Sequence, residues 1–136
     1  MAEGEPQDPA VSQQHLDRLL TGFTERVPGA LRAVVITSDG VLIAVSDRTK
    51  PDDLEQLSAI TAGLISLATT AAQIVGNGAV IQALVTMQRG TLVIMAADHG
   101  SSLAVLTTAT ADLDLVAYEM TMLVEESGSL FTPPAR

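Results

Sequence analysis

The sequence contains no cysteine and no tryptophan, and it has only one tyrosine and two phenylalanines. The absence of cysteine excludes disulfides, iron–sulfur clusters and a thiol nucleophile. Basic residues are also scarce, since seven lysines and arginines face sixteen acidic residues and leave a net charge of −9 over 136 residues. This balance argues against nucleic acid and anionic membranes as partners, because both require clustered positive charge. The mean hydropathy of +0.34 excludes a largely disordered chain, and the length suits one domain with its own core.

Charged residues are concentrated towards the two ends of the chain. Residues 1–56 hold ten acidic and five basic residues, whereas residues 57–111 hold only Arg89 and Asp98. Residues 57–88 carry no charge at all. An uncharged segment of this length suggests either a membrane span or a surface that another chain covers.

The membrane interpretation is the weaker of the two. Residues 57–75 have about the length of a spanning helix, but six serine, threonine and glutamine side chains interrupt them and no basic residue flanks them. The acidic, polar N-terminus does not resemble a signal peptide. We therefore expect a cytoplasmic protein that does not insert into a membrane and that reaches one only through its partners.

The apolar pattern predicts eight elements in the order α-β-β-α-β-β-β-α, within a domain at 12–128 that follows a disordered arm at 1–11 and precedes a flexible tail at 129–136. The predicted elements are a helix capped by Ser12 and ended by Pro28, strands at 30–37 and 41–46, a long helix that follows a Thr49–Asp52 capping box and runs to Val75, strands at 80–87, 91–97 and 101–107, and a last helix at 111–126 capped by Thr110.

Short links between the strands favour antiparallel pairing throughout. Asp39-Gly40 between two β-rich runs predicts a hairpin with a type I′ turn. The expected fold is therefore α+β, with a five-stranded antiparallel sheet. We expect the long central helix on one face of this sheet and the N- and C-terminal helices on the other.

Residues suited to catalysis do not form a recognisable site. His15 and His99 are far apart in the sequence and lack metal-ligand spacing. Asp98, His99 and Ser101 are the residue types of a hydrolytic triad, but they lie too close together in one turn. Gly76-Asn77-Gly78 follows a helix, whereas a phosphate-binding loop precedes one. We expect no catalytic residue, no metal ligand and no cofactor.

Arg89 is the only basic residue between positions 57 and 111, and it lies at a predicted hairpin tip. An exposed arginine there could stabilise a transferring phosphate in the active site of another protein. The simpler interpretation is a solvated turn residue.

The long helix is the main indication of function. Its larger apolar residues recur three and four apart and are predicted to face the sheet: Leu57, Ile60, Leu64, Leu67, Ala71 and Ile74. The remaining face is small and neutral, where lysine and glutamate would be ordinary. We interpret it as a covered surface, although an alanine- and threonine-rich helix can also tolerate exposure. The next strand, if it is a sheet edge, adds unpaired backbone groups, and a two-fold homodimer would bury both features. The predicted dimer and partner interface comprises Ser58, Ala59, Ala62, Ile65, Ser66, Thr69, Gln73, Val80, Gln82 and Leu84.

Five segments, in this order and spacing, resemble the Roadblock (dynein light chain) domain: residues 33–40, 57–67, 87–90, 100–106 and 116–120. They are most similar to the bacterial members that are encoded beside a sensor kinase and a small Ras-like GTPase. The resemblance extends over about residues 12–128.

The resemblance implies a profilin-like fold and a homodimer formed through the long helix and the third strand, with a merged sheet. It also implies non-catalytic regulation of a small Ras-like GTPase, as an activator or an adaptor, in a signalling complex with the sensor kinase. The helix pair would form the GTPase platform, and members generally insert no arginine finger, so Arg89 would at most face the GTPase. The alternative function is a small-molecule-sensing α+β domain, although residues that could line a pocket are scarce.

Overall fold

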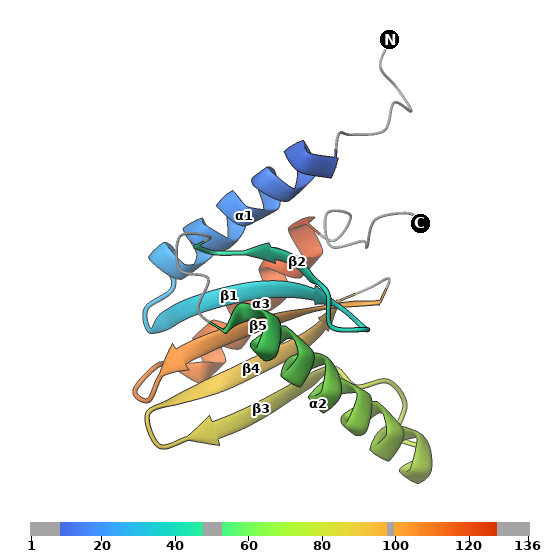
Figure 1. Ribbon diagram of the computed structural model, residues 1–136. Coiled ribbons are helices and arrows are strands. Elements are labelled where there is room, and N and C mark those ends of the chain that lie inside the picture. Colours follow the sequence, from blue (N-terminus) through green and yellow to red (C-terminus); the bar gives the residue numbers. More distant parts are fainter. Residues whose placement is uncertain (1–8, 48–52, 98–99, 128–136) are drawn as a thin grey trace.

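The computed structural model describes residues 9–47, 53–97 and 100–127 (Figure 1). Within these ranges the chain forms three helices and five strands in the predicted order. The predicted tail lies outside the described residues, as do the first eight residues of the predicted arm. The elements are α1 (Pro9–Arg26), β1 (Ala30–Thr37), β2 (Leu42–Val45), α2 (Leu54–Val75), β3 (Gln82–Met87), β4 (Gly90–Ala97), β5 (Ser101–Thr108) and α3 (Leu113–Ser127).

All five strands form one antiparallel sheet in the order β2-β1-β5-β4-β3. β1 pairs with β5, so the first hairpin joins the later three-stranded meander in one sheet. β2 and β3 are consequently the two edge strands. The predicted α+β fold with a five-stranded antiparallel sheet is confirmed.

The sheet has α1 and α3 on one face and α2 on the other (Figure 1), and an apolar layer lies on each face. On one face, α1 and α3 pack against the sheet through Leu16, Leu20, Phe23, Val27, Val116, Met120 and Leu123. On the other face, α2 covers a smaller cluster formed by Val34, Ile36, Val45, Leu92, Ile94 and Ala104. Consecutive residues of β1 enter opposite layers, because side chains alternate along a strand. The predicted placement of the long helix opposite the two terminal helices is therefore confirmed.

The turn between β1 and β2 is not the predicted type I′ turn. Gly40 has a φ of 88°, but Asp39 has no positive φ. The amide of Gly40 donates to the carbonyl of Thr37 at 3.0 Å, and the amide of Thr37 donates to the carbonyl of Val41 at 2.9 Å. The loop thus has three residues with one left-handed glycine at its end. The Thr37 hydroxyl, which donates to the Asp39 carboxylate, holds the loop in this form.

The starts of α1 and α3 also differ from prediction. α1 begins at Pro9, so residues 9–11, predicted as part of the disordered arm, are helical, and Ser12 lies inside the helix and not at the N-cap position. Proline suits the first helical position because its missing N–H is not needed there. In α3 the Asp112 carboxylate accepts a hydrogen bond from the amide of Leu115 at 3.1 Å, so Asp112, and not Thr110, is the N-cap.

α2 begins after Asp53, which has a left-handed φ of 55° and makes no side-chain capping bond. The predicted capping box at Thr49 and Asp52 lies outside the described residues. The helix ends as predicted at Gly76, which has a φ of 69° and donates to carbonyls of the last turn. Its 22 residues make α2 about 33 Å long.

Replacing each of two glycines by alanine should change the free energy of unfolding in opposite directions. Gly29 lies in the turn between α1 and β1, and Gly22 lies inside α1. Gly29 has a φ of 86°, and an added Cβ would lie 2.6 Å from the Cβ of Ala111. We expect Gly29→Ala to lower the free energy of unfolding by at least about 1 kcal/mol, because it adds both strain and a clash. Gly22→Ala, inside α1 with nothing within 4 Å of the added Cβ, should raise it by up to about 1 kcal/mol. Urea unfolding measures both, and equal effects would contradict this packing.

Candidate partner interface

Most of α2 is exposed in the single chain. Its buried side chains are Leu54, Ser58 and Thr61, all in the N-terminal half. The exposed fraction reaches 57% at Ile60, 71% at Leu67 and 79% at Ile74. In Figure 1 the helix crosses the sheet diagonally, and its C-terminal half continues past β3. A large apolar surface on this helix is therefore open to solvent.

The predicted orientation of α2 is wrong. The stripe expected to face the sheet is exposed at Ile60, Leu67, Ala71 and Ile74 and half-buried at Leu57. Of this stripe, Leu64 packs against the sheet-side cluster as predicted. Of the residues predicted to face outward, Ser58 is fully buried, with its hydroxyl donating to the Leu54 carbonyl at 2.8 Å, and Ala62 and Ile65 pack against the sheet-side cluster. The other predicted helix residues are exposed, namely Ala59, Ser66, Thr69 and Gln73.

The reason for the difference is that α2 carries two stripes with the same spacing. Residues 54, 58, 61, 65, 68 and 72 also alternate in steps of four and three, and all six are buried or half-buried. They include serine, threonine and alanine, whose small side chains let the helix lie close to the sheet. The larger residues of the other stripe repeat as the a and d positions of a heptad, which is the pattern of a helix that pairs with another helix. We call this stripe, which is exposed at four of its six positions, the seam: Leu57, Ile60, Leu64, Leu67, Ala71 and Ile74.

Among the described residues, α2 is the one helix that is long and apolar enough to cross a membrane by length and composition alone. In the folded chain one of its sides packs on the sheet. Inserting α2 into a membrane would uncover that side of the sheet, including Ile36 and Ile94. Contact with protein accounts for the apolar surface without this loss.

β3 is a free sheet edge beside α2, so the condition set for it in the sequence analysis is met. It pairs with β4 on one side and has no neighbouring strand on the other. Of the residues predicted for the interface, Val80 is half-buried just before the strand, whereas Gln82 and Leu84 are exposed within it. Because α2 and β3 are joined by a short loop and pack together, they form one continuous uncharged surface.

Arg89 is exposed at the turn between β3 and β4, at the border of this surface. Sequence analysis identified its position correctly. No hydrogen bond or ion pair of Arg89 indicates a second role in the described part of the chain.

The described residues contain no group of three or more histidine, cysteine, aspartate or glutamate side chains that could hold a metal ion. His15 is exposed on α1. Asp98 and His99 lie outside the described residues. The structure therefore does not test the rejected triad that they would form with Ser101.

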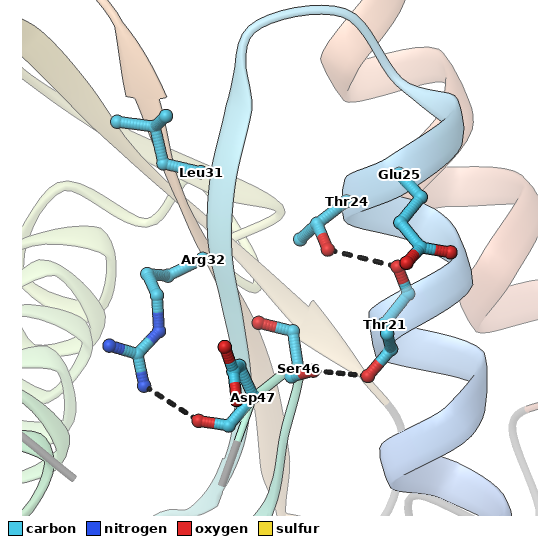
Figure 2. A pocket seen from close by; sticks show the side chains of 7 residues that line it. All are labelled: Thr21, Thr24, Glu25, Leu31, Arg32, Ser46 and Asp47. Atoms are coloured by element: carbon cyan, nitrogen blue, oxygen red, sulfur yellow. Dashed lines mark hydrogen bonds between the residues drawn. The ribbon is translucent and has the colours of Figure 1, made fainter. Parts of the chain in front are cut away.

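A hollow of about 460 Å³ lies near the opposite sheet edge, between α1 and the β1–β2 hairpin (Figure 2). Its walls are mainly polar. The hydroxyl of Thr21 donates to the carbonyl of Ser46, and the guanidinium of Arg32 donates to the carbonyl of Asp47 at 3.3 Å. These side chains join neighbouring elements, and none of the seven lining residues is aromatic. The hollow thus lacks the apolar lining of a typical small-molecule site.

The sheet with one helix on one face and two on the other is a Roadblock-like, profilin-like α+β fold. Residues 16–107 match the model of the Roadblock/LC7 domain. A Roadblock/LC7 domain from Streptomyces avermitilis is 34% identical, with a TM-score of 0.78 over 83% of this chain and 94% of that one. The chain belongs to the Roadblock/LC7 domain family.

More distant structures share the fold alone. Myxococcus xanthus MglB is 18% identical, with a TM-score of 0.70 over 90% of this chain and 93% of that one. Schizosaccharomyces pombe profilin is 15% identical, with a TM-score of 0.53 over 87% and 97% of the two chains. None of the curated proteins compared with this chain matches it.

The two stripes of α2 predict opposite effects for neighbouring substitutions. Ile65→Glu places a carboxylate against the sheet-side cluster at a half-buried position and should lower the free energy of unfolding by about 1 kcal/mol or more, because the charge loses solvation there and the apolar contact is lost. Leu67→Glu, at a residue 71% exposed, should keep the far-UV circular dichroism of the folded chain. If the Leu67→Glu variant were unfolded and the Ile65→Glu variant were as stable as the wild type, the stripe that contains Leu67 would be the one that packs on the sheet.

Proposed function

We propose that this protein is a non-catalytic, homodimeric regulator of a small Ras-like GTPase, acting as a GTPase activator or an adaptor. The observation that carries the proposal is the uncharged seam of α2 beside the free edge of β3. Membership of the Roadblock/LC7 domain family supports the GTPase as the class of partner.

The position of the seam on α2 supports pairing with a second copy. At 100° per residue, the seam lies about a quarter turn or slightly more around the helix from the stripe that meets the sheet. It therefore faces sideways, along the sheet surface, where a second helix in the same layer would lie. A two-fold dimer would bury the seam and the β3 edge together, because both lie on the same side of the molecule.

Pairing through the seam would leave a third side of α2 free. Ala59, Gly63, Ser66, Thr70 and Gln73 are exposed and lie on this side. Their small, neutral side chains form a surface that costs little to desolvate, which suits a transient protein partner. We assign this side of the paired helices as the GTPase platform.

In this proposal the protein works in the cytoplasm, within a signalling complex that includes a sensor kinase, and it reaches a membrane only through its partners. The GTPase supplies the catalysis. Small-molecule sensing remains the alternative, but the polar hollow beside α1 does not favour it.

The dimer predicts that a charge in the seam separates the subunits. Leu67→Glu should raise the dimer dissociation constant by about 30-fold or more, because it would place two carboxylates against apolar side chains across the axis. Sedimentation equilibrium measures the dissociation constant. Tyr118→Glu is the control, since Tyr118 is 60% exposed but lies on α3, on the other face of the sheet. Equal weakening by both variants, or none by either, contradicts an interface through the seam.

The regulatory role predicts binding to a small Ras-like GTPase from the same genome, tested first with any encoded beside this gene. The wild-type dimer should bind it in at least one nucleotide state in a pull-down assay. Arg89→Ala should leave stimulated GTP hydrolysis within about twofold, whereas loss of an arginine finger lowers it 10³-fold or more. Failure to bind in every nucleotide state would refute the regulatory role, and a large loss on Arg89→Ala would place Arg89 in the GTPase active site.

A further inference from the structure

β2 is the other edge strand of the sheet, and side chains of α1 bond to its backbone. The amide of Val45 donates to the carboxylate of Asp17 at 2.9 Å. The side-chain amide of Gln13 donates to the carbonyl of Ile43 at 3.1 Å. Outward-pointing backbone groups of an edge strand have no partner within their own sheet. α1 therefore supplies hydrogen bonds that a neighbouring strand would otherwise supply.

The pairing of β2 with β1 shows that these two backbone groups point away from the sheet. The amide of Ser46 donates to the carbonyl of Ala33 in β1 at 2.9 Å, so the amide of the preceding residue, Val45, points to the other side. Ile43 is the extra residue of a bulge in this strand pair, and such a residue is not paired by the opposite strand. Both groups are therefore ones to which a further strand would bond.

The spacing of residues along α1 matches the spacing along β2. The helix lies beside the strand and runs in the same direction (Figure 1). Four residues advance about 6 Å along a helix, and two residues advance about 6.7 Å along a strand. Gln13 and Asp17 are four residues apart, and their partners on β2 are two apart. Thr21, four residues further on, donates its hydroxyl to the carbonyl of Ser46 just beyond the strand.

The two edges of the sheet thus differ in what lies against them. A polar stripe of α1, formed by Gln13, Asp17 and Thr21, follows the β2 edge. Among the described residues, no side chain forms a hydrogen bond with the backbone of β3. β2 is also short and bulged, and both features discourage the addition of a strand.

We propose that α1 closes the β2 edge of the sheet to strands of other copies of this chain. The bonds between α1 and β2 do not depend on the proposed function. Their effect on assembly builds on it, because a homodimer that buries both β3 edges still carries one β2 edge at each end. Open β2 edges would let such dimers add to one another without limit. The stripe on α1 therefore keeps the assembly finite.

Hydrogen exchange at two neighbouring amides tests the cover. The amides of Val45 and Ser46 bond to different elements, α1 and β1, at the same distance of 2.9 Å. Asp17→Ala should accelerate exchange at Val45 by about tenfold or more and leave Ser46 within about twofold, because only Val45 loses its acceptor. Asp17→Asn keeps a side-chain oxygen and should restore most of the protection. Equal acceleration at both amides would overturn the cover, since it would mean that the whole hairpin is loosened.

Removal of the cover should also allow further assembly. The double variant Gln13→Ala/Asp17→Ala should form species larger than those of the wild type in sedimentation velocity, in a fraction that rises with protein concentration. Within these species the amide of Val45 should be protected again, because a strand of another copy accepts its hydrogen bond. Gln14→Ala/Glu25→Ala is the control, since it removes a glutamine and an acidic residue from exposed positions of the same helix that make no bond to β2 in the described structure.

Three results would contradict the proposal. The double variant would keep the size distribution of the wild type, or its larger species would leave Val45 unprotected, or the control would grow equally and so implicate the lost charge. The wild type in the same runs tests the proposed homodimer separately. A monomeric wild type would refute the homodimer, whereas exchange at Val45 would still decide whether α1 covers the edge.

Discussion

α2 carries two stripes of residues suited to burial, but the sheet can bury only one of them, and the rest of the structure depends on this constraint. The stripe of small residues, with Ser58 and Thr61 fully buried, brings the helix close to the sheet. The seam of larger residues stays exposed in the single chain at Ile60, Leu67, Ala71 and Ile74. Burial of apolar surface is the main favourable term in association as well as in folding, so the exposed seam is a source of binding free energy that folding has not used.

The order of the strands brings the other half of this surface into place. Because β1 pairs with β5, the chain's first hairpin extends the sheet on one side and leaves β3 as the edge on the other. The loop after Gly76 then keeps that edge next to the end of α2. Polar side chains such as Arg32 and Thr21 are used between elements at the opposite edge. The molecule thus separates a structurally occupied side from an open one, which is the arrangement expected of a protein that acts through its partners.

Local patterns were sufficient to predict the order of elements, the placement of α2 on the face of the sheet opposite α1 and α3, and the end of α2 at Gly76. They could not decide which side of α2 meets the sheet, because both stripes repeat in steps of three and four and differ only in side-chain size. The turn after β1 also escaped prediction, since Asp39 is held by the Thr37 hydroxyl and does not adopt a positive φ. Gln82 and Leu84 were placed correctly on a free edge, whereas Ser58 was not, because its hydroxyl bonds within its own helix. Periodicity identifies surfaces; side-chain volume and short-range hydrogen bonds decide how they are used.

The free edge of β3 also affects how the chain behaves between its synthesis and its assembly. Many proteins protect such an edge with lysine, proline or a bulge, but Gln82 to Met87 contain none of these and pair regularly with β4. A newly synthesised copy therefore presents a strand to which other nascent or unfolded chains can add. The interval between release from the ribosome and encounter with a suitable strand is its most vulnerable period. Synthesis of several copies from one message, close together in space and time, would shorten that interval.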